Sequence, residues 1–160
     1  MTEETCTKQG TLLHIHTAAR SGRPMLSLES ALAVVEQGIA GDRYAAGLGR
    51  YSRSPGLREI TLFEVETIQA LREELKVDLQ PHEHRRNLTT EGIALDDLVG
   101  TTFSVGEVVL EGLGPCRPCR YLNMMSKKQI FTKLADRAGL FCRVVSGGTL
   151  HVGDRIVPTG

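Results

Sequence analysis

Short stretches of alternating apolar and polar residues run along this chain, and this period of two is typical of half-buried β-strands. In the first stretch, TLLHIHTA (11–18), Leu13 and Ile15 lie on the face opposite to His14 and His16. A second stretch, 101–114, predicts a hairpin with a tight glycine turn. Strands are also predicted at 58–65, at 87–90 and, as two or three short strands, at 140–157.

Apolar residues at helical spacing predict three helices in the same chain. The first covers 27–38, where Ser27 supplies an N-cap and Gly38 a C-terminal glycine. The second helix is predicted at 64–75 and the third at 126–139, and a single turn of helix is expected at 95–100.

Together these elements predict a mainly β fold. The strands outnumber the helices and do not form regular β–α–β units, which favours an antiparallel, barrel-like sheet with a few peripheral helices. The length suits one domain over residues 1–160, in which residues 1–9 are expected to be a flexible N-terminus. The glycine-rich segment 38–56 is long for a simple connection, and this length indicates a functional loop.

Composition argues against several classes of partner. Lys plus Arg number 19 and Asp plus Glu number 19, so no overall field attracts nucleic acid or an anionic membrane. Aromatic residues make up only 4%, and no apolar run approaches the ~20 residues that span a bilayer. We therefore expect a cytoplasmic protein without a nucleic-acid or membrane partner. In that reducing compartment its four cysteines are expected to be thiols, metal ligands or catalytic groups.

The candidate chemistry is concentrated in the motif GPCRPCR, where Cys116 and Cys119 stand among arginines. Cationic neighbours lower the pKa of a thiol. The side chains of Arg117, Arg120 and Arg143 would also bind an oxyanion through fork-shaped hydrogen bonds. The interpretation we favour is one thiolate in a cationic pocket.

Three other interpretations of the thiol pair stay open. Cys142 and His151 could complete a Cys3His zinc site with Cys116 and Cys119, although their spacing does not form a second knuckle. A redox dithiol would be expected at a helix N-terminus, and none is predicted there. The cysteines could also be buried and unreactive.

Four histidines and one arginine outside this motif are expected to be exposed unless they belong to a binding site. His14 and His16 share a strand face and could bind a metal, but exposure is the default. His82 and His84 could bind a metal or act as a general acid near the site, but exposure is again the default, and Arg85 is expected to be solvated.

Six stretches, in order and at sensible spacing, resemble the MOSC domain, the family named for the C-terminal domain of molybdenum cofactor sulfurase. Short pieces such as GDR would be weak alone, but the ordered set is fairly specific. The stretches are GIAGDRY (38–44), REITLFEVE (58–66), RRNLTTEGIAL (85–95), LVGTTFSVGEVVLE (98–111), GPCRPCRYL (114–122) and RAGLFCRVVSGGTLHVGDRI (137–156).

The resemblance implies a β-rich, barrel-like domain in which a cysteine carries sulfur or ligates the molybdenum of a pterin cofactor. The family cysteine falls at Cys119, and Cys116 is then an auxiliary thiol.

Five other residues in the matching stretches offer groups that could serve such a cofactor. Arg86 and Asn87 suit pterin edges or a phosphate. Asp42 and Arg43 lie in the glycine-rich loop. Arg58, at the start of a strand, is either an anion ligand or an ordinary edge charge.

The function expected from the resemblance is binding of the molybdenum cofactor, sulfur transfer, or both. If the protein is an enzyme, it is a molybdenum-cofactor-dependent oxidoreductase, acting for instance on N-hydroxylated small molecules, or a sulfurtransferase. Sulfur transfer would need a pyridoxal-phosphate desulfurase as a partner, because that cofactor has no site in this chain. Redox chemistry would need a separate electron-transfer protein. The alternatives are a non-enzymatic pterin carrier and a zinc-stabilised interaction domain.

Overall fold

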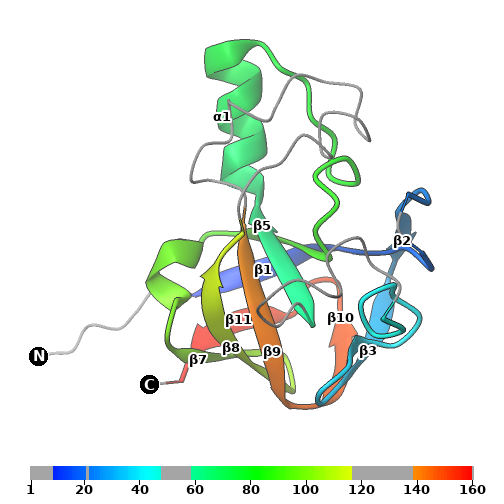
Figure 1. The fold of residues 1–160 in the computed structure, drawn as a ribbon. Helices are drawn as coiled ribbons and strands as arrows, with labels where there is room; N and C mark the ends of the chain where they lie inside the picture. Colours follow the sequence, from blue (N-terminus) through cyan, green and yellow to red (C-terminus); the bar gives the residue numbers. More distant parts are fainter. Residues whose placement is uncertain (1–8, 21, 48–58, 117–138, 160) are drawn as a thin grey trace, which may run out of the picture.

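The fold is a closed β-barrel with a small second sheet on its side and a helix at one end (Figure 1). In this computed structural model, residues 9–20, 22–47, 59–116 and 139–159 are described. The strands are β1 (Gly10–Thr17), β2 (Leu26–Leu28), β3 (Ser30–Val34), β4 (Gly38–Ile39), β5 (Ile60–Glu64), β6 (Leu88–Glu91), β7 (Thr102–Val105), β8 (Val108–Pro115), β9 (Leu140–Ser146), β10 (Gly148–His151) and β11 (Arg155–Pro158). The helices are α1 (Val65–Leu75) and the short 3-10 helix η2 (Leu95–Leu98).

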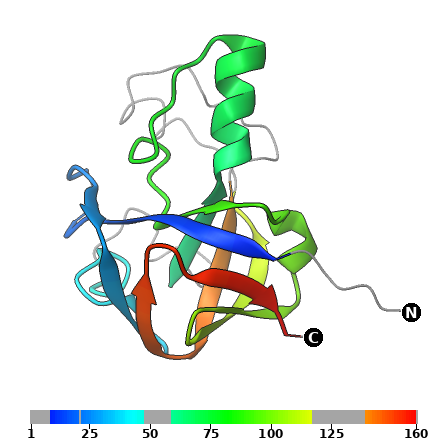
Figure 2. The same cartoon turned by 180° about the vertical axis from the view of Figure 1, so that it is seen from behind.

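Seven strands close the barrel in the order β11-β7-β8-β9-β5-β6-β1, and β11 pairs with β1 to complete the circle. These two strands lie side by side in Figure 2. All pairs are antiparallel except β5 and β6, which are parallel because α1 connects them. Strand β2 adds to one end of β1, and β10, β3 and β4 form the second sheet.

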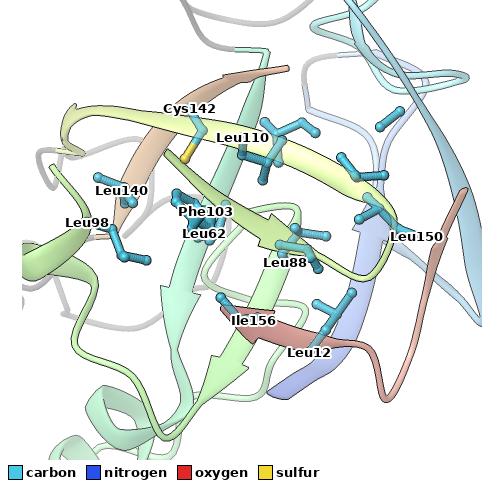
Figure 3. Close-up of a cluster of buried hydrophobic side chains, with 14 of the residues drawn as sticks. Leu12, Leu62, Leu88, Leu98, Phe103, Leu110, Leu140, Cys142, Leu150 and Ile156 are labelled. Carbon is cyan, nitrogen blue, oxygen red and sulfur yellow. The ribbon is translucent and has the colours of Figure 1, made fainter. Parts of the chain in front are cut away.

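Apolar side chains from the barrel strands fill its interior (Figure 3). Alternation along each strand sends every second side chain inward, as the burial pattern of β8 shows. Leu150 of β10 joins the same cluster, which attaches the small sheet to the barrel. Each fully buried Leu or Phe contributes about 1.5–3 kcal/mol relative to an exposed one.

Most of the predicted elements are confirmed. Strands β1, β5 and β6 and the strands of 140–157 lie where the sequence predicted them, and the hairpin β7–β8 turns at Gly106 and Glu107. Helix α1 also forms as predicted. It ends at Lys76, whose left-handed backbone (φ 56°) lets its N–H donate to the carbonyl of Leu71. The turn at 95–98 is the 3-10 helix η2.

The helix predicted at 27–38 is wrong, because this segment forms β2, β3 and β4. Ala33 enters the barrel core, and β3 pairs with β10 and β4 on its two sides. Gly38 does not end a helix. Its φ is 107°, and a Cβ there would lie 2.1 Å from the carbonyl oxygen of Glu59, so only glycine fits this close approach.

The helix predicted at 126–139 falls mainly on residues 117–138, which lie outside the described residues, as does the part of the glycine-rich loop after residue 47. Among the residues that are described, no helix is both long and apolar enough to cross a membrane.

Candidate functional site

A pocket of about 200 Å³ opens where the end of β1 meets the turn that precedes β6. Two segments line this pocket, which we call the Arg85 pocket. One is the loop before β2, with Gly22, Pro24 and Met25, and the other is the turn with His82, Glu83 and Arg85. It therefore combines an apolar wall with groups of both charges.

Arg85 is buried in the wall of this pocket, so the expectation that it is solvated is wrong. Arg85 is only 5% exposed to solvent, and its guanidinium Nη1 donates a hydrogen bond to the carbonyl of Arg23 (2.9 Å). Its backbone has a φ of 63°, which is uncommon for a residue other than glycine. The long stem thus lies along the pocket instead of extending into water.

Asp42 and Arg43 form a buried ion pair behind the pocket (3.0 Å). The same guanidinium of Arg43 contacts the sulfur of Met25 (3.6 Å) and donates to the carbonyl of Arg85 (3.0 Å). The Asp42 carboxylate also accepts the N–H of Ala18 (3.1 Å). These contacts hold two wall residues of the pocket, so the pair acts as its support.

Asn87 is fully buried, and both atoms of its amide are used inside the barrel. Its Oδ1 accepts the N–H (3.1 Å) and the hydroxyl (3.2 Å) of Thr61, while its Nδ2 donates to the carbonyl of His16 (3.1 Å). The geometry therefore ties Asn87 to the junction of β5, β6 and β1. It does not support the expected direct contact with a pterin or phosphate.

Arg86 points to a different neighbour from Arg85. It is half-buried, and its Cγ would lie 3.6 Å from a Cβ placed on Gly139. The carbonyl of Gly139 accepts the N–H of Cys116 (2.7 Å). Arg86 therefore adjoins the base from which the segment with Cys119 departs.

Two histidines that were expected to be exposed are buried beside this region. The ring of His84 stacks on Phe63 (4.3 Å) and meets the edge of the His16 ring (6.3 Å). Burial, followed by the charge of His14, lowers the pKa of His16 to about 4. Burial, followed by the charge of His16, holds the pKa of His84 well below 6.5. Both rings are therefore neutral at physiological pH.

His16 also carries a buried Nδ1 that has no hydrogen-bond partner among the described residues. Within the described part of the chain, no group of three or more His, Cys, Asp or Glu is placed to hold a metal ion.

The two described thiols near the site are both buried. Cys142 points into the barrel (Figure 3), and burial, followed by the charge of Cys116, raises the pKa of its thiol well above 9. Cys116 is 1% exposed and packs with Phe63, Ile68 and Leu71 in a second cluster under α1. Neither environment suits a shared zinc ion.

The other predicted site residues divide into two groups. Arg143 lies on the face of β9 opposite to Cys142, as expected, where it is about half exposed and pairs with Glu111. Cys119, Arg117, Arg120 and Arg58 lie outside the described residues.

Sequence reasoning missed Arg85, His16 and His84. No local signal identified Arg85, because its burial depends on a turn with positive φ and on contacts with Arg23 and Arg43. Nothing in the local pattern could show that His84 is covered by Phe63, because that contact depends on the path of the chain around α1.

The chain is similar to known proteins in sequence profile and in fold. Residues 51–157 match the profile of the MOSC domain. The fold is similar to that of YuaD from Bacillus subtilis (17% identity, TM-score 0.76), with 94% of this chain and 96% of that chain covered. It is also similar to YiiM from Geobacillus stearothermophilus (14%, 0.70; 94% and 75% covered) and to YiiM from Escherichia coli (17%, 0.66; 94% and 70%).

Comparison with curated protein sequences gives no significant match. At identities below 25% the structural similarities concern the fold, and it is the profile match over most of the chain that shows the family. The chain thus belongs to the MOSC domain family, and its role is related to the molybdenum cofactor.

Proposed function

We propose that this MOSC domain binds a molybdopterin-type cofactor, with Arg85 receiving its phosphate and Cys119 supplying a thiolate for its metal or for sulfur transfer. The observation that carries the proposal is the buried guanidinium of Arg85, held in the wall of an open pocket by the carbonyl of Arg23. A buried cation that lines a cavity favours an anionic ligand, and a guanidinium matches two phosphate oxygens at once.

The donor set of the pocket fits one anionic group of that cofactor. Its volume of about 200 Å³ is below the ~300–1,000 Å³ of a typical whole-ligand pocket, so it suits the phosphate and not the entire molecule. Met25 and Pro24 exclude water from one side, which strengthens the attraction between guanidinium and phosphate. When bound, the molybdenum centre would supply oxygen-atom or two-electron transfer.

The position of Arg86 supports a connection between this pocket and the thiol segment. Arg85 and Arg86 are consecutive, and Arg86 lies against Gly139, which is hydrogen bonded to Cys116. Arg86 and Gly139 therefore connect the Arg85 pocket to Cys116, the residue from which the chain continues to Cys119. We propose that Arg86, Arg117 and Arg120 keep that thiol ionised.

Elemental analysis tests the proposal on protein purified from a host that makes the cofactor. We expect molybdenum close to one per chain and a fluorescent pterin after oxidation, both lost in Arg85→Gln and Cys119→Ser. The matched control is Arg155→Gln, because Arg155 pairs with the opposite end of β1 and should leave the content unchanged. Zinc in place of molybdenum, or equal content in Arg85→Gln and the wild type, would contradict the proposal.

Mass spectrometry on the same samples separates the two uses of the thiol. Incubation with a pyridoxal-phosphate desulfurase and cysteine should add one sulfur atom to Cys119 if the domain transfers sulfur. An unmodified Cys119 in protein that contains molybdenum would instead favour metal ligation.

A further inference from the structure

We infer that His84 is a positioning residue that holds Arg85 in its left-handed conformation and so presents the guanidinium to the Arg85 pocket. The inference rests on the proposed anion-binding role of Arg85. It deepens that role by assigning a function to a histidine that touches no ligand.

The first step is the bond between the ring and the backbone. His84 Nδ1 accepts the N–H of Arg86 (2.9 Å), so the ring proton must be on Nε2, which then donates to the hydroxyl of Thr89 (2.8 Å). An acceptor that binds the backbone two residues ahead is the arrangement found in Asx turns, which Asn and Asp usually make. His84 therefore closes a tight turn around Arg85.

The second step is the conformation that this turn imposes. A φ of 63° brings the Cβ of an L-residue close to the backbone, and residues other than glycine adopt it only when their surroundings hold them there. Arg85 is held at three points. Its carbonyl accepts from Arg43, its guanidinium donates to the carbonyl of Arg23, and the next N–H is taken by His84.

The third step is the rigidity of the ring itself. His84 is completely buried and stacks on Phe63 with an interplanar angle of 19°. With Nε2 bound to Thr89 and one face on Phe63, the ring cannot turn away from Arg86 without losing both contacts. Neutral imidazole is required, because a protonated Nδ1 could not accept the N–H of Arg86.

Two substitutions at His84 separate the acceptor from the bulk of the ring. In His84→Asn the side-chain oxygen can still accept the N–H of Arg86, whereas His84→Leu removes the acceptor. Thr89→Val is the matched control, since it removes the partner of Nε2 and leaves Nδ1 in place. The probe is inorganic sulfate, whose charge is constant between pH 4 and 8, titrated calorimetrically into the whole chain.

We expect His84→Leu to bind sulfate about tenfold more weakly, equivalent to about 1.4 kcal/mol, and its Arg86 amide to lose protection against hydrogen exchange. His84→Asn and Thr89→Val should stay within about twofold of the wild type in affinity, although both lower the melting temperature. Unchanged affinity in His84→Leu, or an equal loss in Thr89→Val, would overturn the inference.

Sulfate binding by Arg85→Gln tests the proposed function separately from the role of His84. If neither the wild type nor Arg85→Gln binds sulfate, the pocket is not an anion site. Protection of the Arg86 amide then still decides whether His84 forms the turn: protection equal in His84→Leu and the wild type would rule it out.

Discussion

Replacing Asp42 with alanine should strongly destabilise this domain. The carboxylate is 1% exposed and accepts the N–H groups of Ala18 (3.1 Å) and Tyr44 (3.2 Å) as well as the guanidinium of Arg43 (3.0 Å). Alanine has no carboxylate, so all three of these donors lose their acceptor. It also leaves Arg43 as a buried cation without its carboxylate.

The size of the effect follows from the orphaned charge. Removing one partner of a buried ion pair costs about 3–5 kcal/mol, which is a large part of the ~5–15 kcal/mol that stabilises a typical domain. For a chain of this length, each 1 kcal/mol lowers the melting temperature by about 2–4 °C. Asp42→Ala should therefore melt about 6–20 °C below the wild type.

Urea unfolding followed by circular dichroism would measure the loss, and two further variants would assign it. Asp42→Asn keeps one acceptor oxygen and should fall between alanine and the wild type. The double variant Asp42→Ala/Arg43→Met removes the orphaned charge, so it should be more stable than Asp42→Ala alone.

A loss below about 1 kcal/mol in Asp42→Ala would refute the reasoning, because it would mean that Arg43 is still solvated or paired. With Arg43→Met measured as the second single variant, a double variant whose destabilisation equals the sum of the two single losses would refute it too, because the pair would then have no coupling energy.

Three further outcomes are expected. Cys142 should react with iodoacetamide at least ~100-fold more slowly than Cys119, because burial raises its pKa and blocks access; equal rates by peptide mass spectrometry would contradict this. Stability should fall as pH drops from about 6.5 to about 4, because the unfolded chain protonates His16 before the folded one does. Melting curves at pH 7 and 4.5 should therefore differ more in the wild type than in His16→Phe. Gly38→Ala should lose about 2 kcal/mol or more, and Gly41→Ala only about 1 kcal/mol, because both have positive φ but only a Cβ at Gly38 meets backbone. Equal losses on urea unfolding would show that the close approach at Gly38 is not limiting.

The barrel strands and α1 could be predicted because their signals are local. Alternation in β1 and β8 and the spacing of Val65, Ile68 and Leu71 depend only on neighbouring residues. The segment 27–38 could not be resolved in this way. Its Ala, Leu and Val residues suit either period, and β3 exists because β10, far along the chain, pairs with it.

The candidate site was harder to predict, because it depends on which side of the backbone each arginine takes. Arg86 was preferred to Arg85 from its place in the family-like stretch RRNLTTEGIAL, yet Arg85, which has a positive φ and a backbone carbonyl bound by Arg43, is the one that lines the pocket. The inward direction of Asn87 likewise follows from three bonds to β5 and β1, and no spacing along the chain reveals those bonds.

The hydrogen bond between Cys116 and Gly139 joins the residue that follows β8 to the residue that precedes β9. The described part of the chain stops at Cys116 and resumes at Gly139, so this hydrogen bond holds the two ends of the intervening segment together. The entropy cost of closing a connection grows only by about 0.6 kcal/mol for each doubling of its length. A change in the length of the thiol-bearing segment should therefore cost little loop-closure entropy as long as Cys116 and Gly139 keep this hydrogen bond.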